Sequence, residues 1–193
     1  MGNWLRERQD WFIMLLLFLF LTSVYYATTS GLTSSNDGSH YALTRALAEN
    51  KQFAIAPFDP YAEGNDIAVR DGVFYSDRPP GTALVATLFY GLGGLLPQPL
   101  APLPSRHDAD NPRLPYVLLL PVLAGAATAV LLYWFMRQLS VSAAAALLAA
   151  LMFGLGTLHW KYSTVLFSHA LSGLLVVATV VAISVFSSQY SVV

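Results

Sequence analysis

The chain has no cysteine among its 193 residues, and it has little charge. The absence of thiols excludes disulfides, iron–sulfur clusters and thiolate zinc sites. Charged residues make up 11% of the chain and apolar residues 55%, against about 25% and about 45–50% in an average soluble domain. The net charge of −1 gives no surplus of Lys and Arg, so we expect no nucleic-acid partner. This composition indicates a membrane protein.

Four stretches of the chain contain no Asp, Glu, Lys or Arg, and each can hold a spanning helix of about 20 residues. They are residues 11–36, 114–136, 138–159 and 162–193. We therefore predict an all-α multi-pass membrane protein with the lipid bilayer as its first partner. The sequence predicts about four transmembrane helices, at 11–29, 114–136, 141–158 and 165–187.

The orientation follows from the position of the basic residues. Arg6 and Arg8 precede the first apolar run, and positive residues next to a span remain cytoplasmic. We expect residues 1–10 in the cytoplasm and an uncleaved first helix. The insert 30–113 carries every Asp and Glu except Glu7 and Asp10, and we expect it outside.

The apolar segment 81–96 within this insert leaves two topologies open. The segment (GTALVATLFYGLGGLL) is rich in glycine and bounded by prolines. If it crossed the membrane, Arg137 would lie outside in a tight loop, whereas positive residues in short loops favour the inside. We therefore expect a re-entrant or interfacial helix.

Two further elements are expected in the insert. Asn36 or Asp37 can cap a surface helix over 37–50. The Asp71-Gly72 pair predicts a hairpin over 66–76. Asp37 itself has two interpretations that do not exclude each other: a capping carboxylate, or a base or cation ligand just outside a span.

The remaining candidate residues flank the apolar segment and the last span. Asp77 and Arg78 precede Pro79-Pro80, and they form either a rigid turn with a solvated ion pair or a phosphate-binding arginine. His169 at the start of the last span either has a functional role or caps the helix, and Lys161 can snorkel. We expect no cofactor, with a divalent metal on the histidines, Asp37 and Asp77 as an open alternative. The acidic residues Asp59, Glu63 and Asp66 lack the pattern of a calcium loop, and we expect a solvated face.

The order of these features resembles the N-terminal part of the GT-C membrane glycosyltransferases. The resemblance rests on NDGSHYALTRAL after the first span, YSDRPPG after the hairpin, and a following span that ends at Arg137. The chain is most similar to bacterial relatives of the protein O-mannosyltransferases and lipid A aminoarabinose transferases. These enzymes transfer a sugar from a polyprenyl phosphate to an acceptor on the outer face of the plasma (cytoplasmic) membrane.

The resemblance implies a site. Asp37 would be the catalytic base, and SDRPPG would match the Lys-Pro-Pro motif of the family, with Arg78 in place of Lys. The substrate-binding residues implied are Tyr41, Asp77, Arg78, Lys161 and His169. Two departures are the missing second acidic residue after the third span and the four spans, where the family has ten or more. We therefore expect a truncated or partial enzyme that needs further spans or a partner chain.

Two other classes of protein remain open. One is a non-catalytic assembly or interaction protein, in which Asp37 is a cap and Arg78 belongs to a turn. The other is a transporter fragment, although transporters bury ionisable or helix-breaking residues near mid-membrane and the spans here are free of charge. An enzyme predicts that Asp37 and Arg78 converge on one site.

Overall fold

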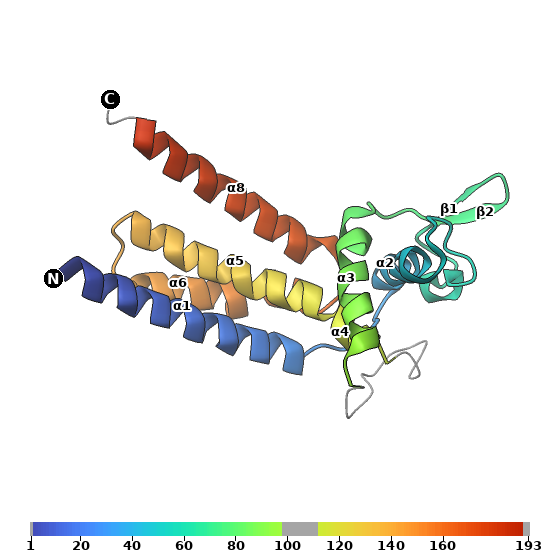
Figure 1. Ribbon diagram of the computed structural model, residues 1–193, viewed down its shortest axis with the longest axis horizontal. Helices are drawn as coiled ribbons and strands as arrows, with labels where there is room; N and C mark the ends of the chain where they lie inside the picture. The colour runs from blue at the N-terminus through green and yellow to red at the C-terminus, as the bar shows by residue number, and fades with distance from the viewer. Residues whose placement is uncertain (1, 98–111, 191–193) are drawn as a thin grey trace. The chain divides into compact units, whose positions relative to one another are not determined.

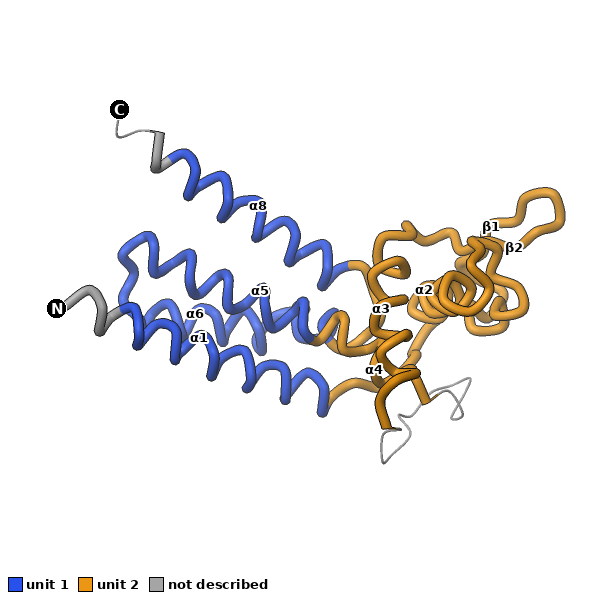
Figure 2. Tube along the Cα trace, in the orientation of Figure 1, with its two compact units in different colours: residues 1–27, 123–163, 169–193 blue, residues 28–122, 164–168 orange. Residues whose placement is uncertain are grey.

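The computed structural model describes residues 2–97 and 112–190, so that part of the expected outside insert, 98–111, is outside the described residues. The chain divides into two compact units, coloured separately in Figure 2. Unit 1 comprises residues 1–27, 123–163 and 169–193, and unit 2 comprises residues 28–122 and 164–168.

Unit 1 contains the long apolar helices (Figure 1). Within residues 2–97 and 112–190, three segments are long and apolar enough to span a membrane: Glu7–Ala27, Leu114–Gln138 and Ser168–Ser187. They lie in or include α1 (Gly2–Ala27), α5 (Leu119–Gln138) and α8 (Ser168–Tyr190). The chain is therefore a mostly helical membrane protein with three helices of spanning length.

The third of the four expected spans is shorter than predicted. Helix α6 (Ala143–Gly156) has 14 residues, or about 21 Å at 1.5 Å per residue, against a hydrocarbon core of about 30 Å. Thr157 has extended backbone angles and ends the helix. A short helix, α7 (Leu158–Tyr162), follows and begins with the Thr157 hydroxyl as its cap.

A polar cluster joins one end of α1 to the opposite end of α5. Tyr133 Oη donates to Asp10 Oδ1 at 2.6 Å, and Arg137 Nε donates to the same oxygen at 2.8 Å. Arg137 Nη1 also donates to the Val141 carbonyl at 2.5 Å. The start of α1 and the end of α5 are thus neighbours, and the two helices run antiparallel. This is the arrangement expected if segment 81–96 does not cross the membrane.

At the other end of unit 1, helices approach each other through glycine. Tyr25 is fully buried and its hydroxyl donates to the Gly154 carbonyl at 2.9 Å. A Cβ on Gly154 would lie 2.9 Å from Tyr25 Oη. The ring of His159 donates from Nε2 to the Gly125 carbonyl at 3.0 Å. Burial lowers the pKa of His159, against a smaller opposing effect of this hydrogen bond, so the neutral ring is favoured.

Unit 2 is built from short elements (Figure 1). Strands β1 (Ile67–Arg70) and β2 (Val73–Ser76) form an antiparallel hairpin, with Val69 opposite Phe74. Asp71 and Gly72 both have positive φ at its turn, as a two-residue hairpin loop requires. The remaining elements are α2 (Ser35–Arg45), the π-helix η1 (Ala46–Asn50), the 3-10 helix η2 (Asp59–Ala62), α3 (Gly81–Leu95) and α4 (Leu114–Val117).

The core of unit 2 is aromatic. Tyr41 is fully buried and stacks edge-on against Tyr61, with ring centroids 5.1 Å apart. Arg45 donates to Tyr61 Oη at 2.8 Å and to Glu49 at 2.9 Å, and Tyr90 donates to the same Glu49 oxygen. Burial alone would raise the pKa of Glu49, but the bonds from Arg45 and Tyr90 outweigh it, and the pKa is lowered. The Arg45–Glu49 ion pair therefore covers the edge of the aromatic core where this core meets solvent.

Helix α2 approaches η2 so closely that only glycine fits at position 38. A Cβ there would lie 2.7 Å from the carbonyl carbon of Tyr61 and overlap its oxygen. The obstacle is backbone, which cannot rotate away as a side chain can. The Asp37-Gly38 pair of the sequence is therefore a packing requirement as well as a helix start.

We predict that Gly38→Ala lowers stability by about 1–3 kcal/mol, the usual cost of overpacking. The thermal unfolding midpoint of the purified protein in detergent measures this effect. Gly91→Ala is the matched control, since nothing lies within 4 Å of a Cβ at Gly91 and alanine is the better helix former. Equal midpoints for the two variants would contradict the close approach of α2 and η2.

Candidate functional site

The Asp37 carboxylate is fully buried at the start of α2. Its Oδ2 accepts from the Thr33 amide at 2.7 Å, and its Oδ1 accepts from the amides of Ser34 at 2.8 Å and Gly38 at 3.1 Å. The hydroxyls of Thr33 and Ser34 also donate to it, at 3.2 and 3.0 Å. The N-cap is Ser34, and Asp37 occupies the third helical position of a capping box. The expectation that Asn36 or Asp37 is itself the cap is therefore wrong, because the carboxylate reaches back to the amides before the helix.

This geometry defines what Asp37 can do. Both of its oxygens already accept from backbone amides, which belong to Thr33 and the N-cap Ser34 just before the helix. The hydroxyls of Thr33 and Ser34 can rotate, however, and each releases a lone pair of Asp37 when it turns away. Because the carboxylate is fully buried, a substrate hydroxyl reaches it only when residues 33 and 34 move aside, and it can then pass its proton to Asp37.

Asp66 joins the start of α2 to the hairpin and to Arg78. Its Oδ2 accepts from Ser35 Oγ at 2.5 Å, and its Oδ1 pairs with Arg78 Nη2. Its carbonyl accepts from Ser39 Oγ at 2.7 Å. Only 17% of the side chain is exposed. The prediction that Asp66 belongs to a solvated acidic face is therefore wrong, because its partners cover it.

Arg78 lies between two carboxylates. Besides its pair with Asp66, its Nε lies 3.1 Å from Asp77 Oδ1. Its amide donates to Ser76 Oγ at 3.2 Å, and that hydroxyl lies 2.7 Å from Ser39 Oγ on α2. The guanidinium side chain is 28% exposed. The expected ion pair with Asp77 is thus present, but Arg78 has a second carboxylate partner.

The other candidate residues are distributed over both units. Tyr41 lies in the buried core of unit 2. It therefore packs α2 against that core and has no exposed surface. Lys161 and His169 belong to unit 1 and are exposed, and the His169 ring stacks on Tyr162 with centroids 4.1 Å apart. Among the described residues, no group of three His, Asp or Glu side chains could hold a metal ion.

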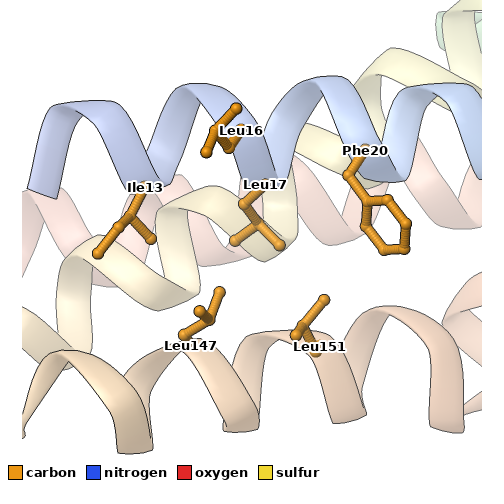
Figure 3. Close-up of a pocket in the computed structure, with 6 residues that line it drawn as sticks. All are labelled: Ile13, Leu16, Leu17, Phe20, Leu147 and Leu151. Atoms are coloured by element: carbon orange, nitrogen blue, oxygen red, sulfur yellow. The ribbon is translucent and has the colours of Figure 1, made fainter.

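Unit 1 contains a hollow without polar side chains. Figure 3 shows Ile13, Leu16, Leu17 and Phe20 of α1 facing Leu147 and Leu151 of α6 across about 220 Å³. These side chains carry no group that can transfer a proton or stabilise charge. Among the described residues, the candidate site is therefore the polar cluster of unit 2, formed by Asp66, Asp77 and Arg78 with Ser35, Ser39 and Ser76. Asp37 lies beside this cluster in the sequence of α2 and has its own partners, Thr33, Ser34 and Gly38.

Sequence reasoning found Asp37, Asp77 and Arg78 but missed Asp66 and the three serines. Ser35 and Ser39 are four residues apart on α2, which places them on one helical face. That spacing was a readable signal for a polar face. The partner of that face was not readable, because Asp66 is a loop residue with a positive φ of 52°.

Comparison of this chain with protein-family models, with curated proteins and with solved structures finds no match. The function must therefore be argued from the site itself and from the resemblance of its motifs.

We predict that Asp66→Asn destabilises unit 2 by about 1.5–3 kcal/mol, the range for hydrogen bonds to charged groups, because Arg78 loses its buried partner. Thermal unfolding in detergent measures the loss. Asp71→Asn is the control, since Asp71 at the hairpin turn is 91% exposed. An unchanged midpoint in Asp66→Asn would show that Asp66 does not hold the cluster together.

Proposed function

We propose that this chain is part of a GT-C-like membrane glycosyltransferase, which moves a sugar from a polyprenyl phosphate to an acceptor on the outer face. One observation carries the proposal. Arg78 is joined through Asp66 to Ser35 at the start of α2, and Asp37 lies two residues after Ser35 on the same helix. A base and a phosphate-binding cation near the start of one helix would serve this transfer.

In the proposed reaction, the acceptor hydroxyl attacks the anomeric carbon of the sugar. The new glycosidic bond forms as the bond from that carbon to the phosphate oxygen breaks, and the polyprenyl phosphate leaves with the electron pair. Asp37 takes the proton of the acceptor hydroxyl. Arg78 pairs with the phosphate oxygens and stabilises the charge that develops on them. No metal is required in this scheme.

Substrate binding would change the partners of Arg78. Its guanidinium has five donors, and one of them bonds to Asp66. A phosphate can use the donors that remain or replace Asp66. On this proposal Lys161 and His169 are further candidates for substrate contacts.

We propose four transmembrane helices, with α6 as the third, and a cytoplasmic N-terminus in the plasma membrane. Further spans or a partner chain would complete the carrier site.

The second candidate function is a non-catalytic assembly or interaction protein. A specific observation favours it: both Asp37 oxygens are occupied by capping-box amides, and this alone explains a buried carboxylate at the start of a helix. In this case the pair of Arg78 and Asp66 serves only to attach the hairpin to α2.

Binding of a short-chain polyprenyl phosphate to the purified protein tests the proposal. We predict saturable binding by the wild type and at least tenfold weaker binding by Arg78→Ala, about 1.4 kcal/mol. Arg70→Ala is the matched control, because Arg70 lies on the same hairpin with a side chain 86% exposed. Equal losses in both variants would indicate unspecific charge attraction. Absence of binding in the wild type would fit both an incomplete carrier site and the second candidate, and the same measurement on a longer gene product would separate the two.

The topology can be tested separately, since the chain has no cysteine. We predict that single cysteines at Gln9 and Leu139 react with an impermeant thiol reagent only from the cytoplasmic side, and a cysteine at Asp71 only from the outside. Reaction of the Gln9 and Leu139 variants from opposite sides would contradict the antiparallel pair of α1 and α5.

A further inference from the structure

Helix α3 has its side chains distributed in the opposite way to a helix of a water-soluble protein. The face buried in unit 2 carries mostly small residues, namely Thr82, Ala83, Ala86 and Gly93, with Tyr90 as its one large side chain. The exposed face carries large apolar residues: Leu84 is 47% exposed, Leu88 67%, Leu92 49% and Leu95 83%. In a soluble protein the large apolar side chains face the core and polar ones face water. This face of α3 is therefore suited to an apolar surrounding.

The exposed leucines form one continuous stripe. Positions 84, 88, 92 and 95 recur every three or four residues, which places them on one side of the helix. No residue of α3 is charged. The helix has 15 residues, about 22 Å, so like α6 with its 14 residues it is shorter than a hydrocarbon core of about 30 Å. Its two faces, and not its length, therefore indicate its orientation.

The opposite face of α3 is held tightly by protein. A Cβ on Gly93 would lie 2.8 Å from the ring of Tyr116, close to α4, and one on Gly94 would lie 3.1 Å from Arg113 Nη2. The Arg113 guanidinium also lies over the Tyr90 ring, 4.8 Å from its centroid. Arginine and tyrosine next to an apolar face are typical of the membrane–water interface. One side of α3 is thus packed against protein that includes arginine and tyrosine, and the other side is apolar and exposed, as in a helix at a membrane–water interface.

The connections of unit 2 to the three candidate spans indicate which medium covers the stripe. Unit 2 begins at Thr28, directly after the span that ends at Ala27. It also includes Leu114, where the next span begins, and residues 164–168, which lead into the span starting at Ser168. Each of these connections holds unit 2 within a few residues of the bilayer. The nearest apolar medium for the leucines is the lipid itself.

We propose that α3 lies in the plane of the membrane interface, with Leu84, Leu88, Leu92 and Leu95 among the acyl chains of the leaflet next to unit 2. Lipid takes up such a face in proportion to its apolar area. Arg78 is separated from Gly81 at the start of α3 only by two prolines. The depth of α3 therefore holds Arg78 at the level of the headgroups, whether or not the chain transfers sugars.

Single cysteines at Leu84, Leu88 and Leu92 test this proposal on a chain that has no other cysteine. Each is labelled with an environment-sensitive fluorophore, and the full chain is reconstituted into phosphatidylcholine vesicles containing lipids with a nitroxide at the headgroup or along the acyl chain. The control is a cysteine at Asp71, on the exposed turn of the hairpin in the same unit. We expect the three α3 labels to have blue-shifted emission and several-fold stronger quenching by acyl-chain nitroxide than the Asp71 label. The three α3 labels should lie at equal depth in the bilayer.

Three outcomes would overturn the proposal. Water-like emission at all three positions would show that the stripe faces solvent. Blue-shifted emission without quenching by either lipid would show that a second copy or another protein covers it. A steady increase in depth from Leu84 to Leu92 would show a re-entrant helix. The side chains of Leu84, Leu88 and Leu92 are exposed, so a cysteine at these positions removes little packing. If one of the three variants does not fold, a cysteine at Leu95 takes its place in the measurement.

Discussion

The bond between the Asp66 carboxylate and the Arg78 guanidinium connects the parts of unit 2 that form the candidate site. An isolated two-stranded hairpin is at best marginally stable in water, and here its two ends are fixed to α2. Asp66 precedes β1 and bonds Ser35, while Ser76 at the end of β2 contacts Ser39. A charge-assisted bond in a partly buried position is stronger than one at the surface. The hairpin therefore depends on α2 for its place, and Arg78 depends on the hairpin.

Close backbone approach is the second constraint, and glycine provides it in each unit by itself. Within unit 2, Gly38 lets α2 meet the backbone of Tyr61, and Gly93 lets α3 meet the ring of Tyr116. Within unit 1, Gly154 lies against Tyr25. Small residues allow helices to approach where lipid removes the usual hydrophobic drive for packing. In α3 small residues likewise occupy the buried face and leucines the exposed face, which is why we propose that lipid covers it.

The predictable part of the fold was the part determined by local sequence. Uninterrupted apolar length indicated the spanning helices, and Asp71-Gly72 indicated the hairpin turn, since few other pairs adopt two positive φ angles. The N-cap was misplaced because Ser34, Ser35, Asn36 and Asp37 are all good caps, and the choice depends on which backbone the carboxylate reaches. The role of Asp66 was hidden for a different reason. Its partners lie in α2 and after β2, and only the folded chain brings them together.

The charge of the cluster determines which ligands it can accept. Asp66 and Asp77 place two carboxylates against the single guanidinium of Arg78, so the cluster as it stands repels an anion. On the proposed function, a phosphate therefore needs Arg78 to give up a carboxylate partner or needs positive charge from elsewhere. Lys161 is the lysine of the third outside loop in the proposed topology, and a partner chain is the other source. A purely structural cluster has no such need, because it binds no anion. The balance between these two cases rests on whether an anionic ligand can displace Asp66 from Arg78.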